Sequence, residues 1–138
     1  MSQNEIKMSL NNFKNSLLKL QEFLTEPVVN DRDKAGIIQA FEYTFEIAWK
    51  TIQKMAGLHN KNVGSARQAF QAAFELGWLK AEVDSTGEDS WKVMADDRNL
   101  TSYTYKEDIA NAVLTRIREQ HYDRLTALHE RLGKEINL

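Results

Sequence analysis

The sequence predicts an all-α protein, an up-and-down antiparallel four-helix bundle with an additional short helix. Apolar residues recur at steps of three and four along most of the chain, a spacing that places them on one face of an α-helix. Only 1 proline and 6 glycines interrupt the 138 residues, which favours a few long helices over many short strands. No stretch of useful length alternates between apolar and polar residues as a half-buried strand does.

The first two predicted helices span residues 3–24 and 32–55. Pro27 follows the first helix, and the Asn30-Asp31 pair offers a cap for the second, which Gly57 ends. The second helix has the wider apolar face, so we expect it to be central in the bundle. Its apolar positions are Ile37, Ile38, Phe41, Phe45, Ala48, Trp49, Ile52 and Met55, and those of the first helix are Ile6, Leu10, Phe13, Leu17, Leu20, Phe23 and Leu24.

The remaining helices are predicted from their caps. Ser65 and Gln68 form a capping-box pair that begins a short third helix, which ends at Gly77. Residues 81–90 form an acidic surface loop, and a fourth helix spans residues 88–100. Thr104 caps a long last helix that continues to Gly133. The apolar faces are Phe70, Ala73 and Phe74 in the third helix, and Ile109, Val113, Ile117, His121, Leu125, Leu128 and Leu132 in the last.

Composition narrows the class of protein. A length of 138 residues, with 42% hydrophobic and 28% charged residues, predicts one globular domain over residues 1–138. The chain has no cysteine, no apolar leader and no apolar run long enough for a bilayer, so we expect a cytoplasmic protein without membrane attachment. A net charge of −2 argues against broad, non-specific binding to nucleic acid.

Motifs of familiar enzyme classes are absent from the sequence. It contains no glycine-rich phosphate loop, no nucleophile elbow and no HExxH. His59, His121 and His129 lack the spacing of metal ligands, so we predict no metal site and no cofactor. His121 lies on the apolar stripe of the last helix, where a buried, hydrogen-bonded histidine is the expected role.

The carboxylates do not suggest an acid–base pair. Asp96 and Asp97 are neighbours, but adjacent helical residues point about 100° apart, which disfavours a shared proton. Glu42 and Glu46 flank the aromatic face of the second helix and are interpreted as a solvated edge.

The segment 90–105 holds the candidate site. Trp91, Met94 and Arg98 share one helical face, so Arg98 is partly buried and needs an acceptor. A carboxylate of this chain and a phosphate from a partner both satisfy that need. Arg98 and Tyr103 point ~140° apart on a regular helix, so they act together only if the helix ends between them or they meet across a dimer axis. The polar residues after Arg98 are Asn99, Thr101, Ser102, Tyr103, Thr104 and Tyr105.

Three blocks of the sequence resemble the nucleotidyltransferase substrate-binding family. They are FEYTFEIAWK at 41–50, LGWL at 76–79 and SWKVMADDRNLTSYTY at 90–105. The family belongs to the HEPN superfamily, as HepT-like partners of minimal nucleotidyltransferases, and the order of the blocks fits nearly the whole chain. The resemblance implies a helical homodimer that pairs with a nucleotidyltransferase subunit.

Related toxin–antitoxin pairs extend this expectation to single residues. There the HEPN member is a ribonuclease with an arginine-asparagine pair, a histidine and a tyrosine, and the transferase neutralises it by adding AMP to the tyrosine. On this chain those positions are Arg98, Asn99, Tyr103 and Tyr105, so tyrosine replaces the histidine. A phenol with a pKa near ~10 is a poor base at neutral pH, and losing the acid–base group costs on the order of 10²–10⁴ in rate.

Three hypotheses follow from the sequence. The first is a binding module whose Arg98, Asn99, Tyr103 and Tyr105 meet a nucleotidyltransferase or its substrate, a nucleotide or an RNA phosphate, with Tyr105 as AMP acceptor. The second is a metal-independent endoribonuclease with Arg98 and Tyr103 as catalytic residues. In the third, Arg98 pairs with an acidic side chain and the bundle is a passive interaction protein.

Overall fold

The computed structural model describes residues 3–83 and 87–136. Within these ranges the regular structure is helical, apart from one isolated antiparallel bridge between Val83 and Asp89. The all-α prediction is therefore confirmed. The α-helices are α1 (Gln3–Thr25), α2 (Asp31–Gly57), α3 (Ala66–Glu75), α4 (Ser90–Leu100), α5 (Glu107–Arg116) and α6 (Tyr122–Ile136).

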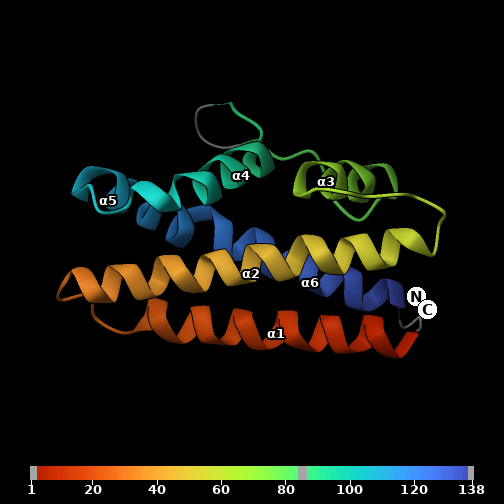
Figure 1. The fold of residues 1–138 in the computed structure, drawn as a ribbon, viewed down its shortest axis with the longest axis horizontal. Helices are drawn as coiled ribbons and strands as arrows, with labels where there is room; N and C mark the ends of the chain where they lie inside the picture. Colours follow the sequence, from red (N-terminus) through yellow and green to blue (C-terminus); the bar gives the residue numbers. More distant parts are fainter. Residues whose placement is uncertain (1–2, 84–86, 137–138) are drawn as a thin grey trace.

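The helices run back and forth along the long axis of one bundle (Figure 1). α1 and α2 are antiparallel neighbours, and α3 and α4 follow one another along the other side of α2. The chain then reverses through α5 and returns through α6, which packs against both α1 and α2. The additional short helix of the prediction is thus one half of a layer that is divided into α3 and α4.

α2 is the central helix, as its wide apolar face predicts. It contacts α1, α3, α4, α5 and α6. Phe41 is fully buried, and burial of a side chain of this size contributes about 1.5–3 kcal/mol. Several predicted core positions are less buried than expected. Phe74 is 49% exposed because the inner face of α3 is formed by Ala69, Phe70, Ala72 and Ala73. The half-buried positions are Phe23, Leu24, Trp49 and Ile109.

Two of the predicted caps are confirmed. Asn30 accepts a hydrogen bond from the backbone N–H of Asp33, and Ser65 Oγ accepts one from the N–H of Gln68. The Gln68 side chain reaches back one residue further than expected, to the N–H of Gly64. α4 begins two residues later than predicted, after a cap by Asp89, and residues 84–86 of the predicted loop lie outside the described residues.

The glycines after α2 and α3 end these helices in different ways. Gly77 follows α3 with φ +79, the left-handed conformation that glycine adopts without steric cost. Gly57 is the last residue of α2, but the left-handed residue there is Asn60, with φ 60, three positions later. Asparagine tolerates this conformation better than most residues.

The prediction that Thr104 caps the last helix is wrong. Thr104 has right-handed helical backbone angles, whereas an N-cap residue needs an extended backbone. Its hydroxyl instead donates to the carbonyl of Thr101, and the helix begins at Glu107 after Lys106. A π-helical segment, Ile117–His121, then connects α5 to α6 within the predicted long helix.

Candidate functional site

Arg98 lies in the last turn of α4, at the edge of the core. Trp91 and Met94, on the same face of α4, are buried, and Met94 is fully so. The Arg98 side chain is 29% exposed. The three side chains therefore share one face of α4, as predicted from the sequence, and Arg98 at the end of that face reaches solvent.

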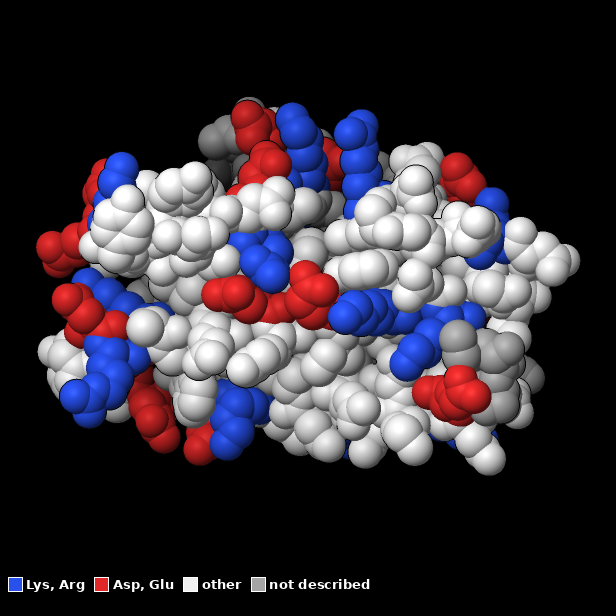
Figure 2. Space-filling model, viewed as in Figure 1, with Lys and Arg blue, Asp and Glu red and all other residues white. Residues whose placement is uncertain are grey.

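Two carboxylates of α2 hold Arg98. Its Nη1 lies 3.6 Å from Glu42 Oε2, and its Nε lies 3.4 Å from Glu46 Oε1. Because Glu42 and Glu46 are four residues apart, they lie on one face of α2 and meet the same guanidinium. In Figure 2, acidic and basic side chains adjoin where α4 meets α2. Both glutamates are about one third exposed, so they form a partly solvated edge, and each of them also pairs with Arg98, which the sequence did not predict.

Further hydrogen bonds orient this ion cluster. Thr101 Oγ1 accepts from Arg98 Nη1 at 3.3 Å and donates to the Arg98 carbonyl at 2.9 Å. Trp49 Nε1 donates to Glu46 Oε2 at 3.0 Å. Both carboxylates lie beyond the ~2.7–2.9 Å of a charge-assisted hydrogen bond, and Arg98 Nε makes no hydrogen bond within the described part of the chain. The guanidinium, with five N–H donors, is fixed in place but retains donor capacity.

Asn99, Tyr103 and Tyr105 lie near the exposed connection from α4 to α5. α4 ends at Leu100, and a 3₁₀ turn over Thr101–Tyr103 follows. The α-helix therefore ends between Arg98 and Tyr103. This is one of the two arrangements under which we expected these two residues to be able to act together. Tyr103 is 50% and Tyr105 78% exposed. Both tyrosines are thus accessible, but no hydrogen bond or ion pair connects either of them to Arg98 among the described residues.

Asp97, next to Arg98, is the centre of a buried network that the sequence did not predict. Arg116 donates to Asp97 through Nε and Nη2, both at 2.7 Å, and His121 Nε2 lies 2.7 Å from Asp97 Oδ2. Burial raises the pKa of Asp97, but the hydrogen bonds from His121 and Arg116 and the charges of those residues outweigh it, so the pKa lies below its usual value. Asp97 is therefore a buried carboxylate that connects α4 to the helices that follow it.

A signal for this network exists in the sequence. Asp97 follows Met94 by three positions, so it shares the buried face of α4 and needs a donor, while His121 lies on an apolar stripe and needs an acceptor. A buried acceptor at Asp97 and a buried donor at His121 would together have suggested that these two side chains are hydrogen-bonded. His121 is fully buried, as predicted, and its ring stacks on Phe41 at 5.4 Å between centroids. It ends the π-helical segment, a kind of distortion that is frequent at functional sites.

The other two histidines have structural contacts. His129 Nε2 lies 3.1 Å from the Leu10 carbonyl oxygen, and its ring meets Phe13 edge-on. His59 packs against Trp78. Across residues 3–83 and 87–136, no group of three or more His, Cys, Asp or Glu side chains is placed to hold a metal ion.

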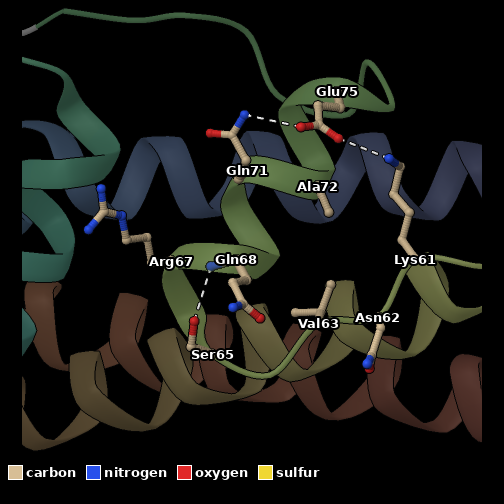
Figure 3. Close-up of a pocket in the computed structure, with 9 residues that line it drawn as sticks. All are labelled: Lys61, Asn62, Val63, Ser65, Arg67, Gln68, Gln71, Ala72 and Glu75. Carbon is tan, nitrogen blue, oxygen red and sulfur yellow. Dashed lines mark hydrogen bonds and ion pairs between the residues drawn. The ribbon is translucent and has the colours of Figure 1, made fainter.

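A groove with a volume of about 660 Å³ lies between α3 and the loop before it (Figure 3). Two of its charged side chains pair with each other, since Lys61 Nζ donates to Glu75 at 2.9 Å, and Gln71 donates to the same carboxylate. These contacts hold the pKa of Glu75 below its usual value. Arg67 extends away from Lys61 in Figure 3. None of the four residues predicted for the site lines this groove.

Among the residues that the structure describes, no helix is both long enough and apolar enough to cross a bilayer.

Comparisons with known proteins agree with this architecture. A crystal structure of a Thermus thermophilus protein superposes with a TM-score of 0.70 at 27% sequence identity, covering 91% of this chain and 99% of that one. No functionally curated protein matches the chain. The model of the family described as nucleotidyltransferase substrate binding protein like matches residues 8–134. The chain therefore belongs to the nucleotidyltransferase substrate binding protein like family.

Proposed function

We propose that this chain is a substrate-binding subunit that docks on a minimal nucleotidyltransferase and acts by binding, with little or no catalysis of its own. Family membership supports association with a transferase. The observation that carries the proposal is that Arg98 pairs with two carboxylates of this chain, while Tyr103 and Tyr105, five and seven positions further along the chain, are exposed. Such a face has residues for contact, but it lacks a histidine to move a proton at neutral pH.

The contact residues of this proposal are Arg98, Asn99, Tyr103 and Tyr105. Two copies of the chain form a homodimer that brings two such sets together, and the complex is the toxin-like half of a toxin–antitoxin pair. Tyr105, the most exposed of the tyrosines named for the site, accepts AMP. In that reaction the phenol oxygen bonds to the α-phosphorus of ATP, pyrophosphate leaves, and the phenol proton passes to solvent or to a base of the transferase.

Co-expression with a transferase encoded beside this chain tests the proposal. We expect the two proteins to co-purify and intact-mass analysis to show the addition of one AMP on the wild type but not on Tyr105→Phe. Tyr122→Phe is the control, because Tyr122 is a phenol at the start of α6 and is not among the residues proposed for contact. Failure of the two proteins to co-purify would contradict the proposal. Co-purification without modification would support docking and contradict the role of Tyr105 as AMP acceptor.

A second candidate is a metal-independent endoribonuclease. The exposed part of Arg98 favours it, since its side chain is 29% exposed and a guanidinium suits a transition-state phosphate. An RNA-cleavage assay in EDTA separates the two functions. The binding proposal expects no cleavage by the wild type, and cleavage by Tyr103→His alone would identify a retired active site. Cleavage by the wild type that disappears in Arg98→Ala would establish the ribonuclease.

A further inference from the structure

The Arg98 face, which we define as Glu42, Tyr43, Glu46, Trp49 and Arg98, carries more negative than positive charge. One guanidinium faces two carboxylates, at 3.6 and 3.4 Å. The side chains of Glu42 and Glu46 are 32% and 36% exposed, so neither charge is fully screened by water or deeply buried. Counted by formal charge, the two carboxylates and the guanidinium carry one excess negative charge, and Lys50, whose Nζ lies 5.9 Å from the centre of the Trp49 ring, adds a positive charge at the edge of the face.

This charge balance affects any ligand that approaches Arg98. A phosphate that binds the guanidinium must lie within a few ångströms of it, and therefore close to both carboxylates as well. Like charges at that separation repel, and a nucleic-acid backbone brings several phosphates at once. A basic side chain experiences the opposite force, because it meets two carboxylates and one guanidinium.

The neutral part of the face has the composition of a protein-binding surface. Tyr43 is 60% exposed, and Trp49 is half-buried with its N–H held by Glu46. Tryptophan, tyrosine and arginine are the residue types enriched where protein interfaces gain most of their affinity. Charge and composition thus favour the same kind of partner.

We propose that Glu42 and Glu46 determine the specificity of the Arg98 face, excluding polyanions such as RNA and admitting a protein partner that places a basic side chain against the two carboxylates. This inference rests on the proposed function, because it states the chemistry of the surface through which the transferase docks. Glu42 and Glu46 act by charge, whereas Trp49 and Thr101 hold the cluster in position.

The test measures binding of a fluorescent single-stranded RNA oligonucleotide by anisotropy. We expect weak binding by the wild type and a gain of about tenfold or more in Glu42→Gln/Glu46→Gln, because the substitution removes the repulsion and leaves Arg98 free to bind phosphate. The gain should shrink as salt is raised. Glu26→Gln/Glu130→Gln is the matched control, since it changes the net charge equally at exposed positions elsewhere.

A third variant assigns the gain to the guanidinium. Adding Arg98→Ala to Glu42→Gln/Glu46→Gln should return RNA binding to the wild-type level. Three results would overturn the inference: an equal gain in the control pair, a gain that survives Arg98→Ala, and no gain at all. If the double variant fails to fold by circular dichroism, Glu42→Gln alone, which preserves the Glu46–Trp49 hydrogen bond, should still show a smaller gain.

The outcome of this test can be separated from that of the proposed function. RNA binding by the variants needs no transferase, whereas co-purification needs no RNA. If the transferase docks but the RNA affinities do not change, the specificity role fails alone. If the transferase does not dock, the proposed function fails, and an RNA gain that depends on Arg98 would still establish that the two glutamates exclude polyanions.

Discussion

Asp97 and Arg116 form a bidentate ion pair that joins α4 to α5, with both N···O distances at 2.7 Å. The Asp97 side chain is 3% exposed and that of Arg116 31%. The parallel hydrogen bonds fix two helices in relation to each other as well as neutralising a buried charge. Because Arg98 is the next residue of α4, the same pair also helps to place the Arg98 face.

Asp97→Asn should destabilise the protein strongly. The substitution removes the charge that binds both Arg116 and His121, and breaking a fully buried ion pair costs roughly 3–5 kcal/mol. Arg116 is partly exposed, so we expect a loss near or below the lower end of that range. Urea unfolding gives the free energy of unfolding, with Asp96→Asn as the control because Asp96 is exposed. Equal effects of the two substitutions would contradict the structural role of Asp97.

The same network predicts how stability depends on pH. The pKa of Asp97 is lower in the folded protein than in the unfolded chain, so the unfolded state binds a proton first as the pH falls. The contribution of Asp97 is therefore fully present above its unfolded pKa of about 4 and is lost as pH falls through the folded value. The difference in free energy of unfolding between wild type and Asp97→Asn should narrow below about pH 4. A difference that stays constant from pH 7 to the acid range would show that the carboxylate charge is not involved.

Two glycine substitutions should have opposite effects. Gly77→Ala should cost about 1–2 kcal/mol, because its φ of +79 is unfavourable for a residue with a Cβ. Gly133→Ala should stabilise by about 0.5–1 kcal/mol, because Gly133 lies inside α6 and a Cβ there meets no atom within 4 Å. Thermal unfolding of both variants and of the wild type measures these two changes in stability. A stabilised Gly77→Ala would mean that α3 does not end in the left-handed conformation.

Most of the fold could be predicted from the sequence because periodicity along a helix is local. The steps of three and four in α1 and α2 identify the buried faces directly, and Asn30 and Ser65 are caps that act within one turn. Thr104 failed as a cap because an extra turn, with its own hydrogen bond to Thr101, delays the helix. A capping pattern in the sequence does not by itself show whether the candidate cap residue has the extended backbone that an N-cap needs.

The candidate site was less predictable because its contacts are distant in the sequence. Asp97 meets Arg116 and His121 at separations of 19 and 24 residues, and nothing in the local pattern states which buried acceptor meets which buried donor. The sequence predicts that Arg98 pairs with either a carboxylate of this chain or a phosphate. It does not show that the carboxylates are those of Glu42 and Glu46, because that pairing depends on how α4 packs on α2. The sequence identifies residues that need partners, and tertiary structure pairs them.

The most direct test of the central claim compares Arg98→Ala with the wild type in two measurements, transferase affinity by calorimetry and unfolding temperature. If Arg98 serves docking, affinity should fall by about tenfold or more, as expected for an interface arginine, while stability changes by no more than about 1 kcal/mol, since the pairs it makes are partly solvent-exposed. A lowered unfolding temperature with unchanged affinity would contradict the claim and establish Arg98 as a structural residue of a passive bundle.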